Sequence, residues 1–463
     1  VFGTLEDFDR LVADAHARGM RVIVDWVPNH TSDRHPWFVE SRSSRDSGRR
    51  DWYVWRDSDP GREGPPNNWL AAFGEEKKPA WTFDAKSGQW YLHLFLPEQP
   101  DLNWANPSVR EAMTDVLRFW LDRGVDGFRI DVVHALGKDQ ALPDAPEALA
   151  TIPWCAQNDH ESTHEILRDL RRVIDGYPQR PTTVGEVFLL DTEAVSRYYG
   201  EGDELHLSFN FPPMFCKFEA RCFRRRIEDA AKFLDPRGAW PTWVLSNHDR
   251  PRHRTRYGGT ETAARAAAVM LLTLRGTPFL YAGEELGLED TVVPAEAVVD
   301  PGGRDGCRAP IPWTAESGHG WALDGSEPWL PWPPGAGAGT DAESMRADPG
   351  SILHLYRRLL SLRRSETALS SGYLRLVDAP QDVLAYERGD DRARFLVLIN
   401  FGSDRVVLEE GIGTGGSVAL SSLPTDPAGE DGEPAPFRGV LDAGEALVVR
   451  LANTRADAQA PSA

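Results

Sequence analysis

The chain has 463 residues, enough for a large domain and one or two smaller ones, because single hydrophobic cores stop growing at roughly 250–300 residues. Its 71 acidic and 51 basic residues give a formal net charge of −20, which disfavours nucleic acids and anionic membrane surfaces as partners. No run reaches the roughly 18 apolar residues that a membrane span needs, so we expect no membrane partner and a cytoplasmic location.

Six short apolar runs predict the strands of a parallel sheet, since strands buried on both faces read as continuous hydrophobic stretches. They cover residues 22–27, 125–131, 183–187, 205–211, 242–246 and 278–282. Helices with apolar residues at three- and four-residue spacing are predicted between them, at residues 5–17, 107–122, 162–175, 217–234 and 260–274. This alternation is typical of an α/β fold, the (β/α)8 TIM barrel, of which two βα units are missing here.

Two regions depart from the barrel pattern. Residues 33–106 are rich in Trp, Pro, Gly and Asn and too long for an ordinary βα loop, so they predict a small inserted domain. Short alternating segments at 383–387, 394–400, 405–408 and 446–451 predict a C-terminal antiparallel β domain over 367–453. The barrel then comprises residues 1–32 and 107–366. The polar tail, residues 454–463, is predicted to be disordered, and the Gly/Pro-rich stretch 328–339 to be a loop.

The cysteines form no recognisable framework. The four of them include no CxxC pair and no His at zinc-finger spacing: Cys155, Cys216, Cys222 and Cys307. We therefore expect buried free thiols, with neither disulfides nor a zinc site.

Polar residues mark the carboxyl ends of four predicted strands. The motifs are DWVPNH at 25–30, GFRID at 127–131, GEV at 185–187 and SNHD at 246–249. A single carboxylate at a strand end can simply cap the following helix. However, the carboxyl ends of barrel strands share one face, and three carboxylates gathered there would be a costly way to build a core. The pattern therefore predicts an active site at this face.

The chemistry of these groups fits cleavage of a glycosidic bond with retention, which needs a carboxylate nucleophile and a carboxylic acid about 5–5.5 Å apart. Asp131 can be the nucleophile, because Arg129 lies on the same side of the strand and would keep it ionised. Glu186 has no basic neighbour in sequence, so apolar surroundings would raise its pKa and leave it protonated as the acid. Asp249 can stabilise developing positive charge and hold sugar hydroxyls.

Two histidines at the strand ends are further candidates. His30 and His248 can donate hydrogen bonds to hydroxyls of the same sugar ring, although a histidine is more often a packed structural residue. The 16 Trp and 19 Phe residues also suit a site that binds a sugar ring, but any single Trp is more often part of the core.

DWVPNH, GFRID, GEVF and SNHD, in that order, resemble the four signature regions of the α-amylase family of glycoside hydrolases, family 13. The resemblance covers essentially the whole chain. It implies a catalytic (β/α)8 barrel, an inserted domain after the third strand and a C-terminal β-sandwich. It makes the strand at 22–27 the family's third, so the barrel is expected to be N-terminally incomplete, with the first two βα units absent.

The resemblance also implies roles for individual residues. It matches Asp131 to the nucleophile, Glu186 to the acid/base and Asp249 to the transition-state stabiliser, with ring-binding roles for Arg129, His30 and His248. The segment RDGCRAP at 304–310 resembles the one whose second arginine helps to hold the terminal glucose, which nominates Arg308; its usual acidic partner would lie in the missing start.

No cofactor is assigned to the site. Asn29 matches a calcium ligand of true amylases, but the α-glucosidase branch usually lacks that site, so calcium is not supported by the residues present.

One motif narrows the substrate. QPDLNW at 99–104 resembles the signature of the oligo-1,6-glucosidase and α-glucosidase branch, in which a Val after the nucleophile, here Val132, accompanies α-1,6 activity. The expected function is a retaining, exo-acting α-glucosidase that hydrolyses terminal α-1,4 and α-1,6 bonds of short oligosaccharides through a covalent glycosyl-enzyme intermediate. The expected partner is the oligosaccharide alone, with the oligomeric state left open.

Two alternatives remain. A transglycosylase or isomerase of the same superfamily, of the trehalose synthase or sucrose-acting type, would share the three carboxylates and differ in how well it excludes water. A non-catalytic relative acting as a binding subunit would have lost the carboxylates and would carry a membrane span, and neither applies to this sequence.

Overall fold

The computed structural model describes residues 3–59, 61–73, 78–150, 158–321, 328–409, 411–424 and 435–452. The chain divides into two compact units. Unit 1 consists of Val1–Phe209 with Pro236–Ala239, and unit 2 of Asn210–Asp235 with Trp240–Ala463.

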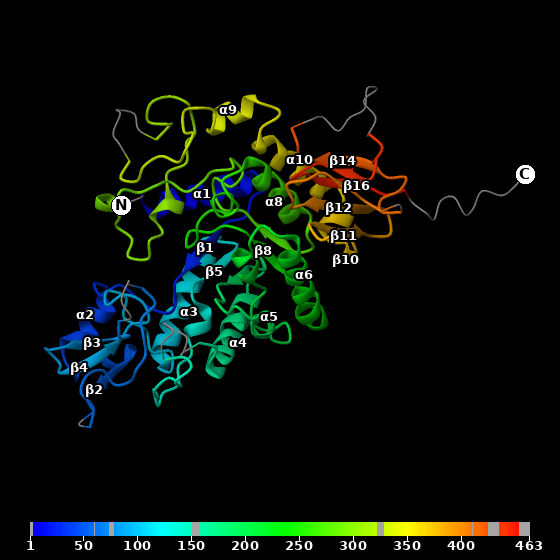
Figure 1. The fold of residues 1–463 in the computed structure, drawn as a ribbon. Coiled ribbons are helices and arrows are strands. Elements are labelled where there is room, and N and C mark those ends of the chain that lie inside the picture. The colour runs from blue at the N-terminus through cyan, green and yellow to red at the C-terminus, as the bar shows by residue number, and fades with distance from the viewer. Residues whose placement is uncertain are drawn as a thin grey trace, which may run out of the picture. The chain divides into compact units, whose positions relative to one another are not determined.

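Unit 1 is built on a parallel sheet of four strands in the order β1-β5-β6-β7. Figure 1 labels the paired strands β1 and β5. These are β1 (Ile23–Trp26), β5 (Gly127–Ile130), β6 (Thr182–Gly185) and β7 (Leu207–Ser208). In the register, Asp25 lies opposite Arg129, and Arg129 opposite Val184. The carboxyl ends of β1, β5 and β6 therefore lie side by side.

The helices of unit 1 are positioned by caps and by one apolar stripe each. They are α1 (Leu5–Ala17), α2 (Pro36–Ser43), α3 (Pro107–Asp122), α4 (Glu161–Asp175) and α5 (Thr192–Ser196). In α3 the Asn106 side chain caps the first turn of the helix. Pro107 suits the first helical position, because a backbone N–H there would have no partner within the helix. The buried residues of α3 recur every four positions, as expected for a helix with one face on the core: Val109, Met113, Leu117 and Leu121.

A small antiparallel sheet lies within the stretch for which an inserted domain is predicted. Its strands, in the order β2-β4-β3, are β2 (Trp55–Asp57), β3 (Trp81–Asp84) and β4 (Gln89–Leu92). Much of the Trp content here is core, because Trp55, Trp69 and Trp81 are all buried. The boundaries of this domain stay a prediction.

Unit 2 contains a pair of parallel strands, β8 (Thr242–Val244) and β9 (Thr277–Phe279). Its helices are α6 (Ala220–Leu234), α7 (His253–Arg256), α8 (Glu261–Thr273), α9 (Ala342–Ala347), α10 (Ile352–Ser365) and α11 (Thr367–Ser370). In α8 every residue from Ala263 to Thr273 is buried, as expected for a helix that is apolar on all sides. Among the described residues, no helix combines the length and the hydropathy needed to cross a membrane.

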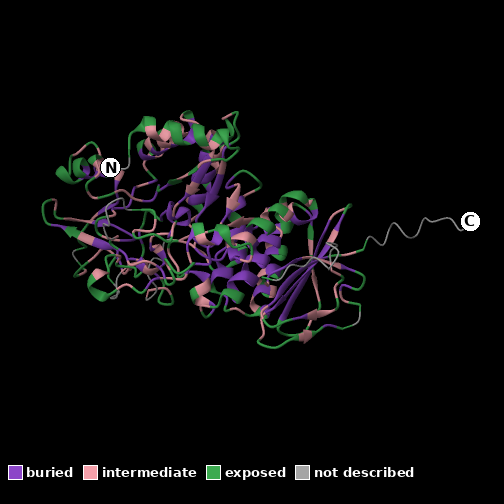
Figure 2. Ribbon diagram, turned by 90° about the horizontal axis from the view of Figure 1, so that it is seen from above, coloured by how far each residue is buried: buried purple, intermediate pink, exposed green. Residues whose placement is uncertain are grey.

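The C-terminal part of unit 2 is an antiparallel sheet in the order β10-β11-β12-β16-β14, with a separate pair β13-β15. The strands are β10 (Tyr373–Val377), β11 (Val383–Gly389), β12 (Arg394–Asn400), β13 (Val406–Val407), β14 (Ser417–Ser421), β15 (Val440–Leu441) and β16 (Ala446–Arg450). Figure 2 shows most of this sheet coloured as buried, and β11 is buried along its whole length.

All six predicted barrel strands and all five predicted helices are present, with ends shifted by at most a few residues. Outside residues 33–106, the sequence did not predict helices α5, α7, α9, α10 and α11 or strands β10, β14 and β15. The predicted loop 328–339 has no helix or strand. The tail at 454–463 lies outside the described residues.

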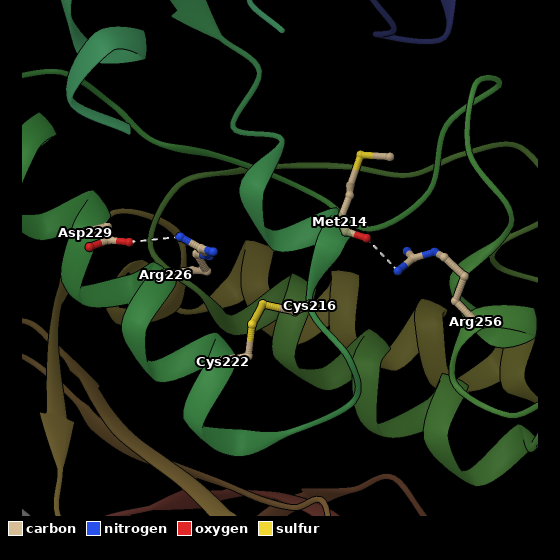
Figure 3. Close-up of a disulfide and its surroundings, with 6 residues drawn as sticks. All are labelled: Met214, Cys216, Cys222, Arg226, Asp229 and Arg256. Carbon is tan, nitrogen blue, oxygen red and sulfur yellow. Dashed lines mark hydrogen bonds and ion pairs between the residues drawn. A yellow bond between two sulfur atoms is a disulfide. The ribbon is translucent and has the colours of Figure 1, made fainter. Parts of the chain in front are cut away.

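The expectation that the cysteines are free thiols is wrong for two of them. Cys216 and Cys222 form a disulfide, with their Cα atoms 5.7 Å apart (Figure 3). The chain turns between the 3-10 helix η5 (Pro212–Phe215) and α6, which brings two cysteines without CxxC spacing together. Cys307 is free and buried, as expected, and Cys155 lies outside the described residues.

This disulfide closes a short loop, so we expect it to stabilise the protein by about 2 kcal/mol, the lower end of the usual range. Reduction should lower the urea midpoint of the wild type. The double variant Cys216→Ser/Cys222→Ser should have the lowered midpoint with or without reductant. Equal midpoints for oxidised and reduced wild type would contradict the expectation.

Candidate active site

The centre of the site in unit 1 is Arg129, which contacts three carboxylates. Its Nη1 donates to Asp25 at 2.8 Å and to Asp131 at 2.7 Å, and its Nη2 donates to Glu186. Asp131 follows β5 directly and Glu186 follows β6, so the parallel register brings both carboxylates to one guanidinium. The side chains of Arg129, Asp131 and Glu186 are 16%, 17% and 10% exposed.

The cluster holds one guanidinium group and three carboxyl groups. Burial alone would lower the pKa of Arg129, but the carboxylates of Glu186, Asp131 and Asp25 outweigh burial and raise that pKa above its ordinary value. Arg129 therefore stays a cation at every pH of interest. One cation among three carboxylate groups can still attract the positive charge that develops on a sugar ring during glycosidic cleavage.

Glu186 has a basic neighbour in space, contrary to the expectation from its neighbours in sequence. Glu186 has none in sequence, but Arg129 reaches it from the adjacent strand. The reason is the register of β5 and β6, which pairs Arg129 with Val184, two residues before Glu186. Neighbours in sequence therefore gave an incomplete account of this carboxyl group's surroundings.

His134 lies against the backbone next to Glu186. It was not among the predicted site residues. Its Nδ1 lies 3.1 Å from the Glu186 carbonyl oxygen and accepts from the Phe188 N–H at 3.2 Å. Burial lowers the pKa of His134 to about 4, so the ring is neutral at physiological pH. Because Nδ1 accepts there, it cannot also donate to the Glu186 carbonyl, so the neutral ring anchors the backbone at Phe188 without adding charge to the site.

Val132 follows the nucleophile candidate in an unusual conformation. It has φ 44° and ψ 38°, in the left-handed region, and is 4% exposed. A β-branched residue there is an outlier that persists only when its surroundings enforce it. Val132 belongs to a buried cluster with Val54 and Trp69, so packing holds the turn that follows Asp131.

His30 lies in unit 1 with both ring nitrogens close to amide groups. Nε2 is 3.0 Å from Gln99 Nε2, and Nδ1 is 3.4 Å from Asn29 Nδ2. Burial lowers the pKa of His30, so it is neutral. A sugar hydroxyl that bonds His30 would have to replace one of these contacts.

Asn29, the residue that resembles a calcium ligand, contacts a buried ammonium group instead. Lys138 Nζ donates to Asn29 Oδ1 at 3.0 Å and to the Ala135 carbonyl at 2.9 Å, and it pairs with Asp101 at 3.1 Å. The side chains of Lys138 and Asp101 are 3% and 0% exposed. Among the described residues, no three His, Cys, Asp or Glu side chains are grouped so that they could hold a metal ion.

Unit 2 carries the remaining candidates, grouped around Asp249. Asp249 Oδ1 accepts from Arg304 Nη1 at 2.8 Å and from Arg308 Nη2 at 3.2 Å. His248 lies beside them, with its Nε2 3.4 Å from Asp249 Oδ2. Arg308 Nε also donates to the His248 carbonyl at 2.8 Å, so one arginine contacts both residues of the motif.

Arg308 has acidic partners within the described residues, while the usual partner expected from the missing start stays a prediction. Arg308 pairs with Asp249 and, at 3.6 Å, with Asp300. Asp300 mainly contacts Arg304, whose hydrogen bonds lower the pKa of Asp300 to about 2. Asp300 and Arg304 were missed because their pairing depends on the fold of a loop without a regular pattern.

The sequence and the fold of this chain are similar to those of known proteins. A model of the α-amylase catalytic domain matches residues 1–372. A probable α-glucosidase of Rhizobium meliloti (strain 1021) is 39% identical over 450 residues, 88% of this chain and 78% of that protein. An oligo-1,6-glucosidase of Halalkalibacterium halodurans is 35% identical over 448 residues, covering 86% and 78%. Among solved structures, the trehalulose synthase MutB of Pseudomonas mesoacidophila MX-45 has a TM-score of 0.85 at 31% identity, covering 97% of this chain and 86% of that one.

The buried ion pair gives a test of stability. Lys138→Met would leave the fully buried Asp101 without its cation, so we expect a loss of about 3–5 kcal/mol in the free energy of unfolding, measured by urea denaturation. The double variant Lys138→Met/Asp101→Leu should recover much of that loss, because no unpaired charge remains. A Lys138→Met variant as stable as wild type would show that the Lys138–Asp101 pair does not contribute to the free energy of unfolding.

Proposed function

The chain belongs to the α-amylase family of glycoside hydrolases, and from that premise we propose that it removes terminal glucose from short α-1,4- and α-1,6-linked oligosaccharides. Members of this family share a (β/α)8 barrel with a C-terminal β domain and a retaining mechanism. The observation that carries the proposal is the single guanidinium of Arg129 between the carboxylates of Asp131 and Glu186. The α-glucosidase and oligo-1,6-glucosidase names of the relatives support the substrate class.

In the proposed reaction Asp131 attacks the anomeric carbon while the carboxylic acid of Glu186 protonates the glycosidic oxygen. The carbon–oxygen bond to the leaving sugar breaks, and an ester to Asp131 forms. A water molecule then attacks the same carbon, and Glu186 takes its proton, which releases glucose and free Asp131. Arg129 donates a hydrogen bond to Asp131 and holds its carboxylate in place for the first step. No metal or other cofactor is required by this chemistry, and we assign none.

The other candidates are given binding roles. We assign to Asp249 the stabilisation of the positively charged transition state, supported by its strand-end motif and its two arginine partners. His248 and Arg308 would bind sugar hydroxyls beside it, and His30 would do so next to Asp131. The finer architecture is also part of the proposal: residues 33–106 form an inserted domain.

An isomerase or transglycosylase is the second candidate, because trehalulose synthase is among the similar structures. Such an enzyme would pass the glucosyl group from Asp131 to a sugar instead of water. Incubation with maltose, isomaltose, sucrose and trehalose, followed by identification of the products, separates the two. Free glucose from maltose and isomaltose supports the hydrolase; rearranged disaccharides from sucrose or maltose support the alternative.

The first activity prediction concerns the two carboxylates. Asp131→Asn and Glu186→Gln should each lower kcat by several orders of magnitude with folding retained, since each removes a group from the bond-breaking step. Asp126→Asn is a matched control, because Asp126 precedes the same strand β5 at its opposite end and contacts His16 and Arg21. It should keep kcat near wild type. More than about a tenth of wild-type activity in Asp131→Asn would refute the nucleophile assignment.

Val132 is expected to influence the preference between α-1,4 and α-1,6 linkages. Val132 is next to the nucleophile, and Val132→Thr exchanges a methyl for a hydroxyl of nearly the same size. The ratio of kcat/KM for maltose over isomaltose should rise, within the roughly 10–200-fold that a methyl-sized pocket change provides. Val195→Thr, at a buried position in α5, serves as the control and should leave the ratio unchanged. An unaltered ratio in Val132→Thr would remove Val132 from the specificity determinants.

A further inference from the structure

The loop that carries His248 and Asp249 is closed at its base by one hydroxyl group. It runs from Ser246, just after β8, to His253, the first residue of α7. Ser246 Oγ accepts from the backbone N–H of His253 at 2.8 Å and lies 2.9 Å from Nδ1 of the same residue. The first and last residues of the loop are therefore joined through a side chain, and both are 2% exposed.

The His253 ring is held in a fixed state. Burial, followed by the charges of Arg256, Arg252 and Arg254, lowers the pKa of His253 to about 3, so the ring is neutral. Because the Ser246 oxygen already accepts from the backbone N–H, its own proton can be donated to Nδ1. Ser246 Oγ and His253 Nδ1 are then both paired, whereas the buried Nε2 of His253 has no hydrogen-bond partner among the described residues.

A buried carboxyl group lies near the ring. Glu284 Oε2 lies 3.9 Å from His253 Nδ1, and Glu284 Oε1 accepts from the Tyr356 hydroxyl at 3.2 Å. Burial raises the pKa of Glu284 to about 8, so it is mostly uncharged at pH 7. The ring of His253 and the Glu284 carboxyl group are therefore both mostly uncharged at pH 7, and the charges that act on His253 are those of Arg256, Arg252 and Arg254.

The loop is also anchored on its other side. Asp249 Oδ1 is bound by Arg304 and Arg308, and Arg308 Nε reaches the His248 carbonyl. Asp249 is therefore held at its carboxylate by the arginines, at its backbone N–H by Asn247 Oδ1, and at the loop base by the Ser246–His253 contact. The arginines fix the direction of the carboxylate only if the backbone beneath it stays in place.

We propose that Ser246 and His253 are positioning residues that set the place of the Asp249 carboxylate for the reaction. This inference rests on the proposed function, in which Asp249 acts mainly in the transition state. Without the Ser246 oxygen, two buried nitrogens of His253 lose their partner, and the loop adopts another path to satisfy them. A displacement of about 1 Å at a catalytic group costs roughly 100-fold in rate.

The test is Ser246→Ala in the full chain, with kcat and KM measured on maltose and isomaltose. We expect kcat to fall about 10- to 100-fold, with KM changed much less, because the affected interaction belongs to the transition state. Ser246→Thr keeps the oxygen and should retain most of kcat. Ser421→Ala is the matched control: Ser421 is a buried serine in β14 that donates to Glu445 at 2.9 Å, and its loss should lower the melting temperature but not kcat.

A second variant covers the case in which Ser246→Ala does not fold. His253→Asn keeps the backbone N–H and places an amide group near the position of Nδ1, so it should fold and lose less of kcat than Ser246→Ala. A folded Ser246→Ala variant with kcat within about threefold of wild type would overturn the positioning role alone, as would a folded His253→Asn variant within the same limit where Ser246→Ala does not fold. A wild type that turns over neither disaccharide would instead overturn the proposed function, and with it the role of this pair.

Discussion

The architecture of the site depends on one constraint: several carboxylates can share a poorly hydrated strand edge only if a cation lies among them. Arg129 meets this constraint from the central position of three neighbouring strands. β1 brings Asp25, β5 brings Asp131, and β6 brings Glu186 to the same guanidinium. The parallel register is what makes this possible, because it aligns the carboxyl ends of the strands. A register shift of one residue would point Arg129 to the other face.

Each group of carboxylates is backed by a buried neutral histidine. His134 accepts from the backbone N–H of Phe188, two residues after Glu186, and His253 binds Ser246 at the base of the Asp249 loop. In both cases burial lowers the pKa far below physiological pH. A neutral imidazole can fix a backbone path without altering the charge balance that the carboxylates and arginines establish. Charged side chains in those places would compete with Arg129, Arg304 and Arg308 for the same carboxylates.

Much of this fold could be predicted from sequence because apolar runs and helical periodicity are local signals, and the contact of Arg129 with Asp131 follows from the period of a strand. The contacts missed were those that join distant segments. The contact of Arg129 with Glu186 depends on the register of two strands. The contact of Arg308 with Asp300 depends on the path of an irregular loop. The disulfide of Cys216 and Cys222 depends on a turn without characteristic cysteine spacing. Helix α10 was overlooked although Ser351 caps it and its buried residues recur on one face.

The Lys138 ammonium has a consequence for how the protein responds to its surroundings. A metal ion that bridged Asn29 and Asp101 would stabilise the fold according to its concentration, because a bound ligand contributes through mass action. The ammonium of Lys138 is attached to the chain and pairs with Asp101 whenever the chain is folded. This part of the fold therefore carries its own counter-ion, and its stability should not vary with divalent ions or chelators in the medium.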